Sequence, residues 1–206
     1  MRILLIVLAA LAASGCAVGN RYSYDVSADL APQGSRTVAV AAQDVRPYVL
    51  SGEKRPNYVG TQRGGFGNPF NVGTQSGRPL AEEFSSAITG ALGRRGFKAA
   101  AVSVEGAAAP DARALAARAG ADRVALVQIV DWKSDTMANV ALHYDLRLRV
   151  LDAGGNELAS NSVSGSDNLG GSAWNPPAHA RQAVPEAFRQ KLQQLFGAPA
   201  VITALR

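Results

Sequence analysis

The side chains that could carry acid–base or nucleophilic chemistry are few in this chain of 206 residues. It contains two histidines, His143 and His179, and a Ser-His-Asp site could be assembled from His179 with Ser164 and Asp167. No Gly-x-Ser-x-Gly turn is present to hold a nucleophilic serine. No cluster of histidine, cysteine or acidic residues has the spacing of a metal site. The sequence therefore predicts no enzyme activity, no metal and no cofactor.

Cys16 is the only cysteine, and it directly follows an apolar run and a group of small residues. Arg2 precedes the run at 3–11, which is too short to span a bilayer, because a spanning helix takes about 20 residues. Small residues at this place are typical of a signal peptidase site. The pattern resembles the lipobox of bacterial lipoproteins, which implies cleavage before Cys16, thioether lipidation and N-acylation. Ala13 departs from that pattern, since leucine is usual three positions before the cysteine.

Lipid attachment at Cys16 would hold the mature chain on a membrane, because more than one acyl chain gives stable anchoring. Ala17 follows the cysteine where aspartate would be found in some lipoproteins. By resemblance to sorted lipoproteins, this residue favours the periplasmic side of the outer membrane over the inner membrane. The alternative is ordinary secretion with cleavage after Ala12, which would leave a free thiol in an oxidising compartment.

The remaining composition is typical of one folded domain with a mildly basic surface. The formal net charge is +5, from 21 basic and 16 acidic side chains. The basic residues are spread along the chain, so we expect no nucleic-acid partner. We expect a signal peptide at 1–15, a lipidated tether at 16–35 and a single periplasmic domain at 36–206, which is long enough to bury a core. The alternative within the tether is a short edge strand, since Tyr22 and Tyr24 alternate with polar residues.

Apolar periodicity predicts an α+β domain. Residues 36–45 and 122–132 are apolar on both faces, as in central strands, whereas 137–151 alternates strictly between apolar and polar residues. Apolar stripes at helical spacing predict helices at 79–95, 110–119 and 178–196. We expect an antiparallel or mixed sheet of about four to five strands, with helices mainly on one face.

Asp44 and Arg46 end the first predicted strand, just before Pro47. Because they are two positions apart, their side chains should point to the same side of the strand. We expect a structural polar pair here, a local ion pair or a clamp on the following loop, and the alternative is a polar pair at a functional site.

The segment at 48–78 is a long loop, rich in glycine and asparagine, inside an otherwise compact pattern. Loops of this length are usually functional or disordered. Tyr58, Arg63, Phe66 and Phe70 are of the types enriched at protein interfaces, so the segment is a candidate partner-binding surface. The alternative is that its aromatic residues pack the loop onto its own domain. Within the segment, residues 57–61 and 70–74 could pair as a hairpin.

The order of these elements resembles the YajG-type family of bacterial lipoproteins. The resemblance rests on the lipobox, a strand ending in Asp-x-Arg, the glycine-containing loop and a helix ending in Arg-Arg-Gly-Phe at 94–97. More distantly, residues 119–127 and 146–155 are similar to the amino-terminal domain of TolB and to curli-secretion lipoproteins. The first resemblance implies a fold and a compartment, and it carries over no catalytic residues.

Together these features favour a membrane-anchored lipoprotein that faces the periplasm and acts as a non-enzymatic binding or accessory module in the cell envelope. We expect it to bind the membrane through its lipid and to bind an envelope protein. The alternatives are a subunit of an envelope secretion or transport assembly and, least favoured, a cell-wall hydrolase. The sequence leaves the partner and the oligomeric state open.

Overall fold

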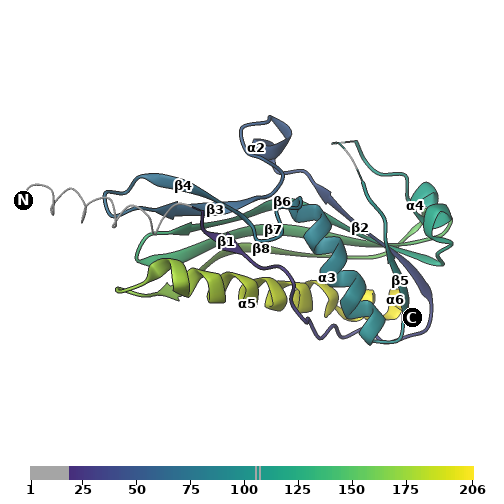
Figure 1. Ribbon diagram of the computed structural model, residues 1–206. Coiled ribbons are helices and arrows are strands. Elements are labelled where there is room, and N and C mark those ends of the chain that lie inside the picture. Colours follow the sequence, from purple (N-terminus) through teal and green to yellow (C-terminus); the bar gives the residue numbers. More distant parts are fainter. Residues whose placement is uncertain (1–18, 105, 107) are drawn as a thin grey trace, which may run out of the picture.

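The computed structural model describes residues 19–206 except 105 and 107, and shows one mixed sheet with helices packed against it (Figure 1). The strands are β1 (Arg21–Tyr22), β2 (Thr37–Asp44), β3 (Tyr58–Arg63), β4 (Pro69–Thr74), β5 (Lys98–Ala101), β6 (Arg123–Thr136), β7 (Asn139–Asp152) and β8 (Glu157–Gly171). The helices are α2 (Pro47–Leu50), α3 (Leu80–Arg94), α4 (Ala112–Ala119), α5 (Pro176–Phe196) and α6 (Pro199–Leu205). Cys16 and the predicted signal peptide at 1–15 lie outside the described residues.

The α+β class is confirmed, but the expected strand number is wrong, because the sheet has eight strands in the described part of the chain. The additional strands come from the segments 16–35 and 48–78, where a short edge strand and a hairpin were the alternatives to a tether and an irregular loop. β1 lies in the predicted tether at 16–35, and β3 and β4 form an antiparallel hairpin inside the segment 48–78.

The sheet divides into two branches along β6. One edge of β6 pairs with β7 over nearly its whole length. The other edge pairs with β2 from Arg123 to Ile129 and then with β3 from Ser134 to Thr136, both in parallel. The ladder with β7 shifts register between Ile129 and Asp131, at the point where the branches separate. We call this point the fork of the sheet.

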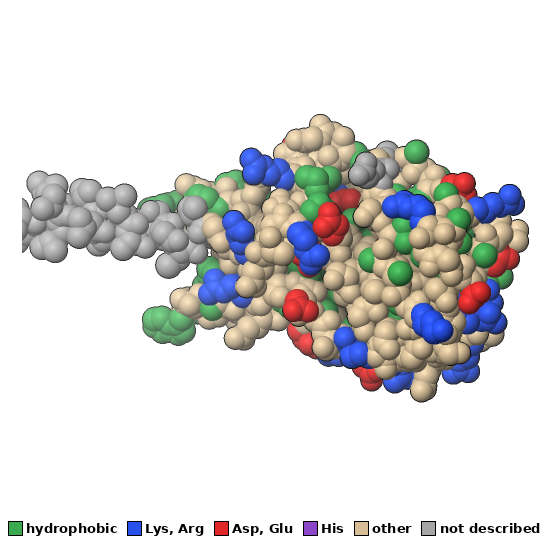
Figure 2. Space-filling view, turned by 45° about the vertical axis from the view of Figure 1, so that its right-hand side comes forward, with side chains coloured by type: hydrophobic (Ala, Val, Ile, Leu, Met, Phe, Trp, Pro, Cys, Tyr) green, Lys and Arg blue, Asp and Glu red, His purple; other side chains and the backbone are tan. Residues whose placement is uncertain are grey.

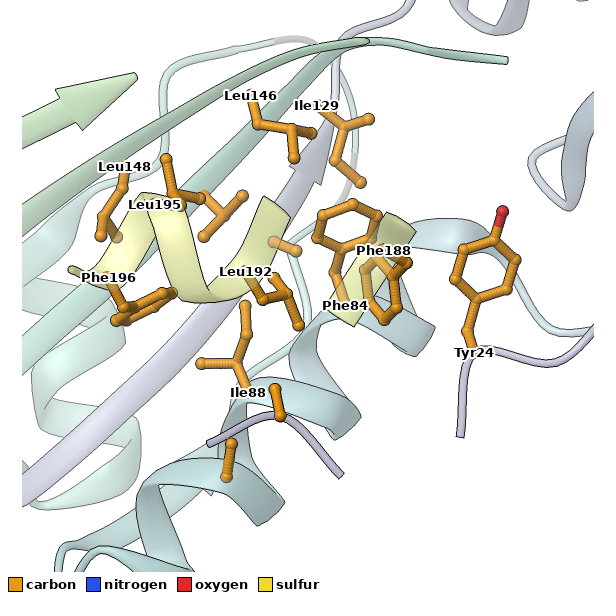
Figure 3. Close-up of a cluster of buried hydrophobic side chains, with 14 of the residues drawn as sticks. Tyr24, Phe84, Ile88, Ile129, Leu146, Leu148, Phe188, Leu192, Leu195 and Phe196 are labelled. Carbon is orange, nitrogen blue, oxygen red and sulfur yellow. The ribbon is translucent and has the colours of Figure 1, made fainter. Parts of the chain in front are cut away.

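Apolar side chains on the two faces of the sheet form two cores. On β2, Val38 and Val40 belong to the larger core while Ala39 and Ala41 belong to the smaller one, as expected for a strand covered on both sides. Helices α3, α5 and α6 cover the larger core, and α4 covers the smaller one through Leu115. Figure 3 shows side chains of α3 and α5 meeting those of the sheet in the larger core.

The described part of the predicted tether, from residue 19 onward, belongs to the domain. Tyr22, Tyr24 and Leu30 are buried, and β1 pairs in parallel with β4. The Trp132 indole N–H donates a hydrogen bond of 2.7 Å to the Tyr24 hydroxyl, and the Tyr24 ring packs edge-on against Phe188. Residues 20–30, which we call the arm, are thus held by the larger core, so the expectation of a tether at 16–35 is wrong for the residues that the structure describes.

Candidate functional site

The Asp44–Arg46 pair occupies the fork of the sheet, and its geometry decides whether it is structural or functional. The Arg46 side chain has no exposed surface. Its Nε donates to Asp44 Oδ1 at 2.8 Å and its Nη2 donates to Asp44 Oδ2 at 2.6 Å, so the carboxylate is bound by two parallel hydrogen bonds.

The remaining N–H groups of Arg46 donate to backbone carbonyls on three segments around the fork. Nη1 reaches the oxygen of Tyr58 at 2.6 Å and that of Trp132 at 3.2 Å, and Nη2 reaches the oxygen of Pro56 at 3.2 Å. A guanidinium has five N–H donors, so all of them are used. No donor of Arg46 is left for a ligand, and the pair joins the end of β2 to the backbone of residues 56–58 and of β6.

Asp44 keeps Arg46 in its charged form. Burial alone would lower the pKa of Arg46, but the hydrogen bonds and the charge of Asp44 outweigh this effect and raise it. Tyr48 on α2 covers the guanidinium, whose central carbon lies 5.5 Å from the ring centre, and its hydroxyl donates to Asp131 at 2.9 Å. The short helix α2 is thereby fastened to β6.

The four residues of the candidate partner-binding surface separate into buried and exposed members. Tyr58 is buried, so it does not lie on a binding surface. Arg63 is exposed but pairs with Asp135 of β6, with Nε to Oδ1 at 2.8 Å and Nη2 to Oδ2 at 2.5 Å. Phe70 is partly buried, and Phe66, in the turn between β3 and β4, is 99% exposed. Only Phe66 offers a fully free apolar side chain.

Three loops carry large exposed apolar side chains at one end of the sheet. Met137 follows Thr136 of β6, which pairs with Gln62 of β3, so it lies next to the turn that bears Phe66. Gly171 of β8 pairs with Asn139 of β7, which places the following β8–α5 loop beside Met137. That loop carries Trp174, which is 97% exposed. We call Phe66, Met137 and Trp174 the apolar tips; the sequence reasoning singled out only Phe66, because exposure of a loop residue leaves no local pattern.

The residues considered for a Ser-His-Asp site do not form one. His179 is held by the carbonyl oxygen of Leu169, at 3.0 Å from its Nε2. Asp167 instead accepts from Lys191 at 2.6 Å and from the Tyr144 hydroxyl at 3.2 Å. Ser164 lies three positions before Asp167 on β8, so the two side chains leave the strand on opposite faces.

Lys191 is a buried cation that the sequence reasoning missed. It lies on the apolar stripe of α5 between Phe188 and Leu195, and this position was the available signal for its burial. Burial would lower the pKa of Lys191, but the hydrogen bonds that its amine donates to Asp167 and Tyr144 outweigh this effect and raise it. The amine is therefore protonated at neutral pH and cannot act as a nucleophile or general base there.

Two features of the described residues also bear on chemistry and membrane attachment. Within 19–206, leaving out 105 and 107, no group of three or more His, Cys, Asp and Glu side chains could hold a metal ion. Over the same residues, no helix combines the length and the apolar character needed to cross a bilayer.

Comparison with known proteins gives likeness in fold alone. No family model matches the chain, and no curated protein matches its sequence. Protein XCC0632 from Xanthomonas campestris, a member of the DUF330 family, is similar in structure with a TM-score of 0.53 and 16% identity over 89% of this chain and 94% of that one. The expected resemblance to the YajG-type family is not confirmed by these comparisons.

Two further solved structures are similar at lower scores. A PelC dodecamer from Paraburkholderia phytofirmans has a TM-score of 0.43 and 13% identity, over 87% of this chain and 94% of that one. Lipoprotein GNA1162 from Neisseria meningitidis has a TM-score of 0.32 and 14% identity, over 76% of this chain and 99% of that one.

Proposed function

We propose that this chain is a lipid-anchored protein of the bacterial cell envelope that acts as a non-enzymatic binding or accessory module. The observation that carries the proposal is the position of Cys16, directly after an apolar run and small residues and only three positions before the first described residue, Gly19. Asn20 and Tyr22 are already buried in the domain. A lipid at Cys16 would thus hold the domain close to the bilayer, because three residues span at most about 10 Å.

The outer membrane is the proposed location, with the domain facing the periplasm. The support for it is Ala17, the residue after the cysteine, which resembles the sorting signal of outer-membrane lipoproteins. Density-gradient separation of the two membranes tests this location, and recovery with the inner membrane would contradict it.

A second candidate function is a subunit of an envelope assembly, and one feature favours it. β8 runs over 15 residues and, within the part of the chain that the structure describes, pairs only with β7. A long open edge is a template for a strand of another chain. An envelope protein or a second copy that supplied such a strand would extend the sheet at β8.

We expect Cys16→Ser to abolish lipid attachment and signal cleavage. Intact-mass spectrometry of the mature wild-type protein should show a chain that begins at Cys16 and carries diacylglyceryl and acyl groups, whereas the variant should keep residues 1–15. Ser14→Ala is the matched control, since it keeps a small residue before the cysteine and should be processed like the wild type. A mature chain that begins after Ala12 and has a free thiol would overturn the proposal.

A further inference from the structure

The apolar tips are the most exposed of the large apolar side chains in the described residues. Five of these side chains are exposed, and the two that are almost fully exposed, Phe66 and Trp174, both lie at the same end of the sheet, together with Met137. Exposed apolar side chains that gather in one region of a protein surface mark an interaction site. Figure 2 shows hydrophobic side chains standing out at the left-hand end of this face, where the visible charged side chains are basic.

Trp174 is held in its exposed position by the local structure. Asn175 is the N-cap of α5, and its side-chain oxygen accepts a hydrogen bond of 3.1 Å from the backbone N–H of Ala178. The backbone N–H of Asn175 donates to the Ser172 hydroxyl at 3.1 Å, and the N–H of Ser172 donates to the carbonyl of Ala138 at 3.2 Å. These bonds tie the β8–α5 loop to the β6–β7 turn, so Trp174 and Met137 form parts of one surface.

The described chain begins beside this same end. β1 runs parallel to β4, with Arg21 opposite Gly73, so the chain that leads into β1 comes from the side where β4 begins, next to the turn bearing Phe66. Gly19 lines a shared hollow with Asn71 of β4. Gly19 is three positions after Cys16, a separation that spans at most about 10 Å, and the turn projects a similar distance beyond Asn71.

We infer that the end of the sheet bearing the apolar tips faces the membrane, and that Phe66 and Trp174 enter the interfacial layer of the bilayer. This inference rests on the proposed function, because it takes the lipid on Cys16 as the link to that membrane. Tryptophan and other aromatic side chains are favoured at the level of the lipid headgroups. A lipid anchor and inserted aromatic residues together fix an orientation that a single flexible link would not.

The charges around the tips fit a lipid surface. Arg21 and Arg181 are exposed near the point where the described chain begins, and Arg181 donates to the side chain of the neighbouring Asn20 at 3.3 Å. Asp135, the acidic residue beside the turn, is paired with Arg63. Basic side chains near a bilayer are attracted to anionic lipids, and a neutralised carboxylate does not oppose that attraction.

Fluorescence quenching by lipids tests the inference, since the two tryptophans differ in position. The mature protein is reconstituted into vesicles of phosphatidylethanolamine and phosphatidylglycerol that contain phosphatidylcholine brominated near the top of its acyl chains. Trp132 is buried in the larger core and lies out of reach of bromine, so it serves as the reference. We expect emission to fall by up to about half, because Trp174 alone reaches the interfacial layer.

Three variants control this measurement. Trp174→Phe should abolish the quenching, because only Trp132 remains. Phe66→Ala should reduce quenching of Trp174, because it removes the other aromatic side chain that enters the bilayer at this end of the sheet. Leu158→Ala is the matched control: Leu158 is another exposed apolar residue, near the start of β8 and so at the opposite end of that strand from Gly171, and its loss should leave quenching unchanged.

Mass spectrometry of the same sample separates this inference from the proposed function. Lipidated protein with unquenched Trp174 would overturn the membrane-facing surface and leave the anchor standing. Quenched Trp174 in protein without a lipid on Cys16 would support the surface and overturn the anchor. An unquenched Trp174, together with photocrosslinking from position 66 to one envelope protein in native membranes, would make the tips a protein interface and overturn the inference.

Discussion

Replacing Arg46 by methionine is expected to lower the free energy of unfolding by about 3–5 kcal/mol, the range for breaking a buried ion pair. The change leaves the Asp44 carboxylate without its partner in a site where its side chain is 12% exposed. It also removes the donors to the carbonyl oxygens of Pro56, Tyr58 and Trp132. Urea unfolding followed by circular dichroism measures the loss.

The chain contains a matched control for this change. Asp145 and Arg147 have the same Asp-x-Arg spacing and form the same two-bond pair, at 3.3 and 3.0 Å, but the Arg147 side chain is 57% exposed. Because water replaces the lost contacts there, Arg147→Met should unfold at nearly the wild-type urea concentration. Equal stability of the two methionine variants would show that Arg46 does not hold the fork together.

Two further variants separate the charge of Arg46 from its geometry. Arg46→Lys keeps the charge but has three donors on one atom, so it cannot serve both carboxylate oxygens and three carbonyls. We therefore expect it to lower the free energy of unfolding, but by less than Arg46→Met does. Adding Asp44→Asn to Arg46→Met removes the unpaired charge and should recover part of the stability. The loss that remains in the double variant measures the unsatisfied carbonyls.

The elements that could be predicted from sequence are those whose burial follows a local period. β2 and β6 are apolar on both faces and β7 alternates strictly, and α3 and α5 each carry an apolar stripe. The fork was not predictable, because it depends on which strands share the second edge of β6. That choice is made by contacts between residues far apart in the sequence.

The arm shows how a visible local signal was misinterpreted. Its apolar residues recur at every second position, at Tyr22, Tyr24, Val26, Ala28 and Leu30. This alternation is typical of an extended segment with one buried face. The alternation was noted only at Tyr22 and Tyr24, as an edge strand in the alternative, and the polar residues favoured a tether. The helices against which the arm packs could not be located from the sequence.

The candidate site was predicted in part, for a similar reason. The spacing of Asp44 and Arg46 was enough to predict a pair, since both lie on one strand. Tyr58 was expected at the surface, but β3 joins the sheet at the fork and buries it. Trp174 was not singled out, because only the arrangement of three loops places it at the same end of the sheet as Phe66 and Met137.

Phe188→Ala is expected to lower the free energy of unfolding by about 3–5 kcal/mol, the range for removing a buried phenylalanine. The Phe188 ring lies at the centre of the aromatic cluster, with ring centres 4.9 Å from Tyr24, 4.7 Å from Phe84 and 5.7 Å from Trp132. Figure 3 shows its ring between those of Tyr24 and Phe84. Its removal would leave a cavity that α5, packed on β7 and β8, cannot close.

The arm should respond to this substitution more than the rest of the sheet, because Tyr24 loses a packing partner while its bond to Trp132 remains. We therefore expect hydrogen exchange to accelerate first at residues 20–30. An arm released in this way would lengthen the link between the proposed anchor at Cys16 and the domain, so quenching of Trp174 in vesicles should fall even while the sheet stays folded.

Phe66→Ala is the comparison, since Phe66 is exposed: it should reduce quenching with no change in urea unfolding or in exchange at the arm. Unchanged exchange at residues 20–30 in Phe188→Ala would mean that β1 and its pairing with β4, rather than the aromatic cluster, hold the arm in place.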